Sequence, residues 1–166
     1  IQNIDRVASG NIYTITKPYT DNKLKDTLDK YQDIVVIGGG FIGVEVAEQL
    51  AQLGKTVHVV EALDHIMSGP FDVEFTDKLK EALEETGTHV HTSERAERFI
   101  VEDGKVVSVK TDKQTLKADA VIMSVGFRPN THFVKDQLEM LGNGAIVINK
   151  YGETSQKDVF SAGDCA

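Results

Sequence analysis

An apolar run that ends in three closely spaced glycines is the feature that most constrains this chain. Residues 34–37 are apolar and β-favouring, and they lead into Gly38, Gly40 and Gly43 in the spacing Gly-x-Gly-x-x-Gly. The segment after Gly43 has helical periodicity, and a second strand-like run ends at the acid Glu61. Strand, glycine turn, helix, strand and terminal acid, in this order, are typical of a βαβ unit that binds a dinucleotide.

The three glycines and the acid have separate mechanical purposes in such a unit. Gly38 allows a tight turn off the strand, and Gly40 has no Cβ, so a pyrophosphate can approach the backbone. Gly43 lets the helix pack close to the strand, while the free N–H groups of the helix face the phosphates. Glu61 is either a solvated strand end or, as we expect, the acceptor for a ribose 2′-hydroxyl. A carboxylate there repels a 2′-phosphate, which favours NADH over NADPH.

The composition is that of an ordinary soluble globular protein, and it argues against several classes of function. The 166 residues are 40% hydrophobic and 27% charged, enough for one full domain with a core. A net charge of −8 argues against binding to nucleic acid. We see no apolar run of about 20 residues that could span a membrane, and no signal peptide. The single cysteine, Cys165, suits a reducing compartment, so we expect a cytoplasmic protein.

The elements around the glycine turn predict an α/β fold. Helices at 42–53 and 72–86 and a third strand at 88–93 give a Rossmann-like βαβαβ order with a parallel sheet. An antiparallel β-hairpin excursion at 96–112, with the turn Asp-Gly, precedes an apolar strand at 118–125. In the second helix, the stripe expected to be buried is Phe75, Leu79 and Leu83. Shorter elements are expected as a strand at 12–16, a helix from 20 or 21 to 30, a helix around 132–137, and strands at 145–148 and 159–162.

Three motifs, in order, resemble those of a known family. They are residues 38–45 (Gly-Gly-Gly-Phe-Ile-Gly-Val-Glu), residues 125–130 (Val-Gly-Phe-Arg-Pro-Asn), and residues 154–164, which hold Thr-Ser and then Val-Phe-Ser-Ala-Gly-Asp. With these motifs the chain resembles the FAD-dependent pyridine nucleotide-disulfide oxidoreductases over nearly its whole length. Within that family it is most similar to the branch of NADH oxidases, NADH peroxidases and coenzyme A-disulfide reductases.

The resemblance implies a domain organisation. Residues 10–127 resemble the NAD(H)-binding domain of the family, and residues 128–166 resemble the returning segment of its split, here truncated, FAD-binding domain. Residues 1–9 would be an interdomain connection. The chain begins at Ile1 rather than at methionine, and it has no second glycine fingerprint, redox cysteine or dimerisation domain of the family's kind. We therefore expect it to be a piece of a longer polypeptide that binds FAD and forms a homodimer.

The resemblance also implies roles for single residues, each with a plainer alternative. Phe41 and Ile42 would lie beside the nicotinamide and flavin rings, or they pack between helix and sheet. Glu45 would reach the nicotinamide carboxamide, or it stabilises the helix start through the dipole. Gly126 would contact the nicotinamide half of NADH, or it forms a turn, and Asp164 would bond the ribitol of FAD. The expected cofactor-binding residues are Gly38, Gly39, Gly40, Phe41, Ile42, Gly43, Glu45, Glu61, Gly126 and Asp164. We expect no catalytic residue and no metal ligand in this chain.

Two further candidates for chemistry are rejected. Cys165 is flanked by Asp164 and Ala166, so it lacks the cationic setting that activates a thiolate. His89 and His91 share one face of a strand, which could suit a metal. No third ligand stands at a characteristic spacing, so exposed strand-edge histidines are the preferred interpretation.

These observations favour one function over two alternatives. In the favoured hypothesis the chain is the NADH-binding portion of a flavoprotein oxidoreductase, in which hydride passes from NADH to FAD and on to oxygen, peroxide or a disulfide. Alone, it would bind NADH without turnover. A short-chain dehydrogenase is disfavoured, because the Tyr-x-x-x-Lys pairs begin at Tyr13 and Tyr19, upstream of the glycine turn. A non-catalytic NAD(H)-sensing module stays open as the alternative.

Overall fold

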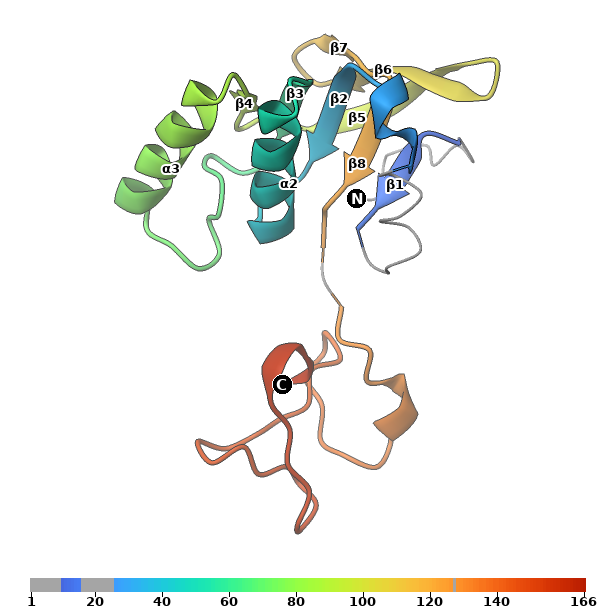
Figure 1. The fold of residues 1–166 in the computed structure, drawn as a ribbon. Coiled ribbons are helices and arrows are strands. Elements are labelled where there is room, and N and C mark those ends of the chain that lie inside the picture. Colours follow the sequence, from blue (N-terminus) through green and yellow to red (C-terminus); the bar gives the residue numbers. More distant parts are fainter. Residues whose placement is uncertain (1–9, 16–25, 127) are drawn as a thin grey trace. The chain divides into compact units, whose positions relative to one another are not determined.

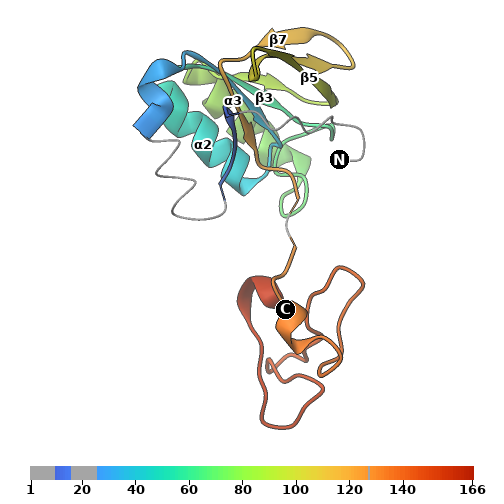
Figure 2. The ribbon, with the colours of Figure 1, turned by 90° about the vertical axis from the view of Figure 1, so that its right-hand side faces the viewer.

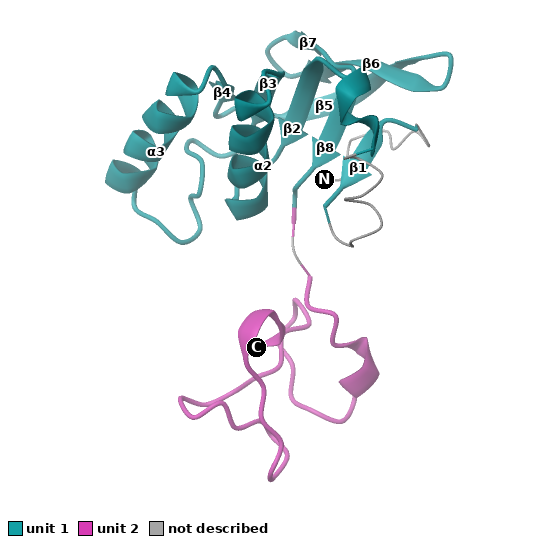
Figure 3. Cartoon of the chain, in the orientation of Figure 1, with its two compact units in different colours: residues 1–125 teal, residues 126–166 magenta. Residues whose placement is uncertain are grey.

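The chain consists of two compact units, Ile1–Val125 and Gly126–Ala166 (Figure 3). The computed structural model describes residues 10–15, 26–126 and 128–166. The division at 125/126 lies two residues before the domain boundary expected from the family resemblance. The assignment of the two segments to NAD(H)-binding and FAD-binding domains stays a prediction, and the two units are described separately below.

The first unit is built on a five-stranded parallel sheet (Figure 1). Its strands, in spatial order, are β1 (Ile12–Thr14), β8 (Ala120–Met123), β2 (Asp33–Ile37), β3 (Thr56–Val60) and β4 (His89–His91). The helix α2 (Phe41–Gln52) connects β2 to β3, and α3 (Val73–Glu85) connects β3 to β4. The predicted βαβαβ order and parallel sheet are therefore confirmed.

After Asp33, the central strand β2 is apolar because both of its faces are covered. Successive side chains of a strand point to opposite faces. Ile34 and Val36 pack with residues of α2 and α3, while Val35 and Ile37 pack with a second sheet. All four are buried. Figure 2 shows the helices and the second sheet on opposite sides of the parallel sheet.

The second sheet of this unit is antiparallel. It contains β5 (Ala96–Glu102), β6 (Lys105–Thr111) and β7 (Thr115–Lys117). Asp103 and Gly104 both have positive φ, as a tight hairpin turn requires, so the predicted hairpin is confirmed. The strand β7 was not predicted, and the strand expected at 118–125 is shorter, Ala120–Met123. A turn after β6, in which the Thr111 hydroxyl accepts the N–H of Gln114 at 2.9 Å, leads the chain back so that β7 pairs with β6.

The buried face of α3 differs from the expected stripe. Leu83 is buried and Leu79 is half-buried, but Phe75 is 65% exposed. Thr76, one position further along, is buried instead, and its hydroxyl donates to the Val73 carbonyl oxygen at 3.0 Å. The helix is thus rotated so that a residue with a locally satisfied hydroxyl faces the core.

Other short elements also differ from expectation. The strand β1 ends at Thr14, and of the helix expected to end at 30 the structure describes only its last residues, including the 3₁₀ turn η1 (Leu28–Lys30). Residues 16–25 lie outside the described part of the chain. No helix in the described ranges is both long enough and apolar enough to cross a bilayer.

The second unit consists mainly of turns. It contains the 3₁₀ turns η2 (His132–Val134) and η3 (Gly163–Cys165). The turn η2 is shorter than the helix expected around 132–137. The strands expected at 145–148 and 159–162 are wrong, because each segment makes only one isolated bridge, Met140 with Ile146 and Glu153 with Phe160. Gly144 and Gly152, both with positive φ, turn the chain close to these bridges.

Candidate dinucleotide-binding site

The turn after β2 lies at the carboxyl end of the parallel sheet, where ligands of open α/β sheets bind. Gly38 has φ +106°, and its N–H donates to the Val60 carbonyl oxygen at 2.9 Å. A Cβ at Gly38 would lie 2.6 Å from the carbonyl oxygen of Ser124. Both the positive φ and this short contact exclude a side chain at position 38. Glycine therefore allows the tight turn between β2 and α2.

Gly43 brings α2 into direct contact with this turn. A Cβ at Gly43 would overlap the carbonyl oxygen of Gly38 and lie 2.7 Å from the Ser124 hydroxyl oxygen. That hydroxyl donates to the carbonyl oxygens of Ile37 and Gly38 at 2.9 and 3.0 Å. Glycine at this position therefore allows helix, turn and the end of β8 to meet at backbone distance.

Gly40 leaves the start of α2 open. It is the N-cap residue, and α2 has no side-chain cap among the described residues. A Cβ there would meet nothing within 4 Å. The first helical N–H to find a helical acceptor is that of Val44, which donates to Gly40 at 3.0 Å. The N–H groups of residues 41–43 precede it, so an open, positively polarised helix end lies beside a glycine, a geometry that fits a pyrophosphate.

The Glu61 carboxylate stands beside this turn and is held in place by main-chain donors. Its Oε2 accepts the N–H of Gly39 at 2.6 Å, and its Oε1 accepts the N–H of Leu63 at 2.8 Å. Glu61 is half-buried. A carboxylate offers about four acceptor positions, so two bonds leave capacity for a ligand's hydroxyls. The acid is thus a fixed acceptor rather than a freely solvated strand end, and its contact with a ribose stays a prediction.

A loop that the sequence did not single out completes the turn. The N–H of Met67 donates to the Gly39 carbonyl oxygen at 2.8 Å, and Ile66 is fully buried. A Cβ at Gly39 would lie 2.8 Å from the Ile66 Cγ2 atom, so Gly39 is enclosed between Ile66 and Glu61. No periodicity or spacing marks Ile66 and Met67, since their role depends on a contact far away in the sequence.

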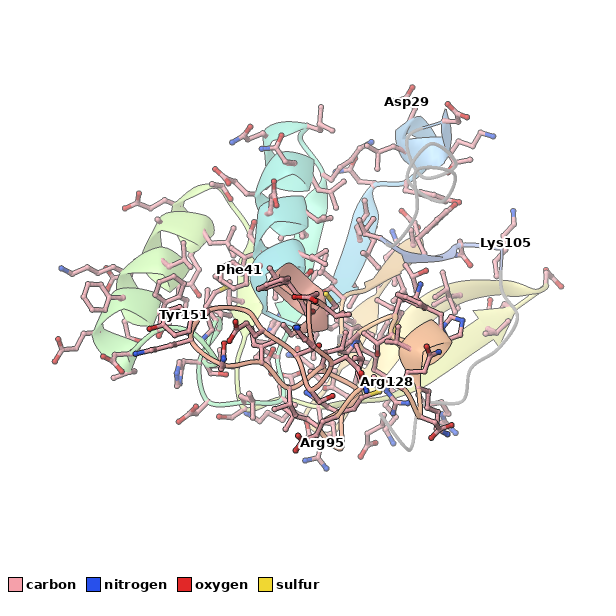
Figure 4. The ribbon with its side chains drawn as sticks, turned by 90° about the horizontal axis from the view of Figure 1, so that it is seen from below. Asp29, Phe41, Arg95, Lys105, Arg128 and Tyr151 are labelled. Atoms are coloured by element: carbon pink, nitrogen blue, oxygen red, sulfur yellow. The ribbon has the colours of Figure 1, made fainter. Side chains whose placement is uncertain are left out.

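Two apolar side chains at the start of α2 are exposed. Phe41 is 60% and Ile42 is 47% exposed, so they do not pack between helix and sheet. The Phe41 ring lies at the N-terminal end of α2 (Figure 4) and contacts Phe71 edge-on, with ring centroids 6.0 Å apart. Phe71 was missed by the sequence analysis, and the only available signal was its place directly after Gly69 and Pro70, a pair that typically interrupts regular structure. The pair offers an apolar surface beside the glycine turn.

The remaining predicted site residues are exposed. Glu45 lies beyond the first turn of α2, which weakens the dipole alternative for it. In the second unit, Gly126 has φ +79°, and Asp164 belongs to the 3₁₀ turn η3. The neighbouring Cys165 thiol donates to the Ala162 carbonyl oxygen at 3.1 Å. The ligand contacts of Glu45, Gly126 and Asp164 stay predictions.

A histidine stack lies on β3 and β4. The ring of His58 stacks on those of His89 and His91, with centroids 4.7 and 5.3 Å apart. Only His89 is exposed, so the expectation of exposed strand-edge histidines is wrong for His91. Burial lowers the pKa of His58 to about 4, and the neighbouring histidines add to this. Burial also lowers the pKa of His91.

Two ring nitrogens of the histidine stack face each other. His58 Nδ1 lies 3.0 Å from His91 Nε2, the distance of a hydrogen bond between the two rings. Within the described ranges, no group of three or more His, Cys, Asp or Glu side chains is arranged to hold a metal ion.

The parallel βαβαβ sheet with an open glycine turn defines the first unit as a Rossmann-like domain. Residues 1–166 match the family model of the pyridine nucleotide-disulphide oxidoreductases, and the chain belongs to this family. It is 46% identical to an NADH oxidase of Enterococcus faecalis over 134 residues, 80% of this chain and 30% of the relative. It is 33% identical to an NAD(P)H coenzyme A polysulfide/persulfide reductase of Pyrococcus horikoshii, with 98% of this chain and 37% of that protein covered.

A solved structure has a similar fold. The water-forming NADH oxidase from Lactobacillus brevis, bound to NADH, matches with a TM-score of 0.87 and 31% identity. The match covers 100% of this chain and 37% of the oxidase. The chain thus spans about a third of the length of the relatives it matches.

Proposed function

We propose that the first unit binds NADH at the turn formed by Gly38, Gly39, Gly40 and Gly43. The pyrophosphate would lie over Gly40 and the first N–H groups of α2, and the adenosine ribose would donate to Glu61. One observation carries the proposal: an uncapped helix start with free space at Gly40 stands next to a carboxylate that two main-chain amides hold in place. The NADH-bound relative supports it.

The exposed residues near the turn would serve the nicotinamide end. Phe41 and Ile42 offer apolar surface at the start of α2, and Glu45 is the nearest exposed acid on the same helix. We assign the carboxamide contact to Glu45 and a contact with the nicotinamide half to Gly126. A Cβ at Gly126 would meet nothing within 4 Å, so a ligand has room to approach its backbone.

We further propose that the chain acts as part of a longer FAD-dependent NADH oxidoreductase. Residues 10–127 would form its NAD(H)-binding domain and residues 128–166 a segment of its FAD-binding domain, with Asp164 toward the flavin's ribitol. Support comes from the family membership and from relatives about three times as long as this chain. FAD, when bound, would accept the hydride of NADH, and oxygen, peroxide or a disulfide would be the final acceptor.

An amide-resolved titration tests the binding site. Adding NADH to the ¹⁵N-labelled chain should shift the amide signals of residues 38–43, and NADPH should do so at higher concentration. A response elsewhere, with these amides unmoved, would contradict the proposal. The chain alone, without flavin, should not oxidise NADH. Turnover under these conditions would contradict the proposal that this chain binds NADH and that FAD accepts the hydride.

A further inference from the structure

A buried carboxylate lies directly behind the proposed ribose-binding acid. Glu94 is only 3% exposed. Its Oε1 accepts the hydroxyl of Thr111 at 2.6 Å, and Gln114 Nε2 donates to its two oxygens at 3.0 and 3.2 Å. All of these donors come from the end of β6 and the turn before β7. Burying a carboxylate is costly, and an apolar side chain of similar size would serve packing alone at least as well.

Main-chain hydrogen bonds join the segment around Glu94 to Glu61. The N–H of Glu61 donates to the His91 carbonyl oxygen at 2.8 Å, and the N–H of Glu94 donates to the Glu61 carbonyl oxygen at 2.9 Å. The N–H of Ser93 donates to the Leu63 carbonyl oxygen at 2.7 Å. The segment 91–94 therefore hydrogen-bonds both the N–H and the carbonyl oxygen of Glu61. It also holds Leu63, whose N–H is one of the two donors to the Glu61 carboxylate.

The side-chain hydrogen bonds around Glu94 have a defined direction. Because Gln114 Nε2 must donate to the carboxylate, its other hydrogen faces His91 Nδ1, 3.2 Å away. That contact requires the His91 tautomer with its hydrogen on Nε2, and this hydrogen then points to His58 Nδ1, 3.0 Å away. Glu94 thus orients Gln114, Gln114 orients the His91 ring, and the whole 91–94 segment is fixed against both neighbouring elements.

We propose that Glu94 is a positioning residue for the dinucleotide site. By tying the segment 91–94 to the turn between β6 and β7, it fixes the main chain on which the Glu61 carboxylate stands, and so sets the preference for NADH over NADPH. This role rests on the proposed function of Glu61 as the acceptor for the ribose hydroxyls.

Matched substitutions of Thr111 test the role while leaving Glu61 and Glu94 in place. Thr111→Val keeps the shape of the side chain but removes the hydroxyl, which donates to Glu94 and accepts the N–H groups of Lys113 and Gln114 in the turn after β6. Thr111→Ser keeps all of these bonds. The dissociation constants for NADH and NADPH are measured on the whole 166-residue chain. Thr111→Val should raise the NADH constant about five- to tenfold and reduce the NADH preference, while Thr111→Ser stays within about twofold of the wild type.

Two further measurements separate positioning from loss of stability. Val109→Ala truncates a buried residue of the same strand β6 and should leave the NADH preference unchanged. The Gly39 amide proton, bonded to Glu61, reports the carboxylate's position without ligand, and its chemical shift should change in Thr111→Val and in Glu94→Gln but not in Val109→Ala. Glu94→Gln provides the second variant if Thr111→Val does not fold.

Each outcome bears on one proposal. If wild type prefers NADH but Thr111→Val and Glu94→Gln keep its preference and its Gly39 shift, the positioning role is overturned and the proposed function stands. An equal loss of preference in Val109→Ala overturns it as well, because general destabilisation then suffices. If the wild-type chain binds neither dinucleotide, the proposed function fails, and the positioning role fails with it.

Discussion

The Gly39 amide donates a 2.6 Å hydrogen bond to the Glu61 carboxylate, which joins the glycine turn after β2 to the end of β3. Through this bond the Glu61 side chain fixes the distance between the proposed pyrophosphate site at the glycine turn and the proposed ribose site. Hydrogen bonds to a charged group are stronger than those between neutral groups, so the carboxylate keeps one orientation. An acceptor that is already oriented loses little conformational freedom when a ligand binds.

Replacing Glu61 with glutamine should remove much of the preference for NADH over NADPH. Glu61→Gln keeps an acceptor oxygen for one amide but presents an NH₂ group on the other side, and it removes the charge that repels a 2′-phosphate. We expect the NADH dissociation constant to rise by about tenfold or more, in line with about 1.5–3 kcal/mol for a charged hydrogen bond. The NADPH constant should change less. Fluorescence titration with both dinucleotides measures this.

A charge-matched control accompanies that prediction. Glu48 is exposed on α2 and accepts a hydrogen bond from Gln52 at 3.2 Å. Glu48→Gln removes the same charge from the same unit, and should leave both dissociation constants near those of the wild type. Equal weakening of NADH and NADPH binding in Glu61→Gln would show that Glu61 supports the fold of the site rather than the choice of ligand.

Alanine at two of the glycines should separate binding from folding. Gly40 has φ −80° and open space around it, so Gly40→Ala should change the free energy of unfolding by less than about 0.5 kcal/mol. The new methyl group would occupy the approach of the pyrophosphate, and NADH affinity should fall. Gly43→Ala drives a methyl into the Gly38 carbonyl and should destabilise the fold by about 3 kcal/mol.

Urea unfolding and NADH titration of both variants measure these effects. Gly54→Ala is unsuitable as a control because Gly54 has φ +75°, whereas Gly69 has ordinary φ and nothing within 4 Å. Gly69→Ala should therefore preserve both stability and binding. NADH binding by Gly40→Ala at wild-type strength would show that the ligand does not approach the backbone there.

The local parts of the site could be predicted from the sequence because their causes are local. The apolar run of β2, the glycine spacing and the acid after β3 follow one another within a single βαβ unit, so the periodicity alone defined the elements. The Asp-Gly turn defined the hairpin in the same way. What these glycines and Glu61 bind was inferred from the motif, and its test is the ligand titration.

The parts that depend on distant contacts could not be predicted. His58 joins His89 and His91 only because β3 and β4 pair in parallel with His58 opposite His89. The burial of Glu94 arises from donors on a turn that the sequence did not reveal. Likewise, Phe75 continues an apolar stripe yet is exposed, since the rotation of α3 is set by its contacts with the sheet rather than by its own pattern.

The histidine stack should make stability depend on pH on the acid side. In the unfolded chain His58 has its ordinary pKa of 6.5, whereas burial and the two neighbouring histidines lower its pKa to about 4 in the fold. The unfolded state therefore binds more protons between these values. The contribution of His58 to stability should be constant above about pH 6.5 and become unfavourable as the pH drops toward 4. Asp33 and Glu94 attract a proton to His58 and reduce this effect.

Substituting His58 isolates its share of that dependence. His58→Gln keeps a polar side chain that does not titrate in this range, so its unfolding midpoint in urea should fall less between neutral pH and pH 4 than that of the wild type. His91, whose pKa is also lowered, should retain the rest of the slope in the variant. Identical slopes in the two proteins would show that His58 takes up its proton in the folded state as easily as in the unfolded one.

A pair of tyrosines near β1 gives a last, independent test of the packing. The hydroxyl of Tyr13 lies 2.8 Å from that of Tyr31 and 3.0 Å from the Thr27 hydroxyl oxygen. Burial first, and next the hydrogen bond with Tyr13, together raise the pKa of Tyr31 to about 12. Tyr13→Phe keeps the ring but removes the hydroxyl. It should destabilise the fold by about 1 kcal/mol, the usual net value of one hydrogen bond.

In the Tyr13→Phe variant the pKa of Tyr31 should fall below about 12 yet stay above its ordinary value of 10.0. The reason is that burial, the largest cause of the shift, persists when the partner hydroxyl is gone. NMR titration of ring-labelled tyrosine follows Tyr31 directly and distinguishes it from the other tyrosines. Thr27→Ala serves as the opposite case, since the Thr27 hydroxyl favours ionised Tyr31 and its removal should raise the pKa. An unchanged pKa in both variants would mean that the two side chains do not interact with Tyr31 in solution.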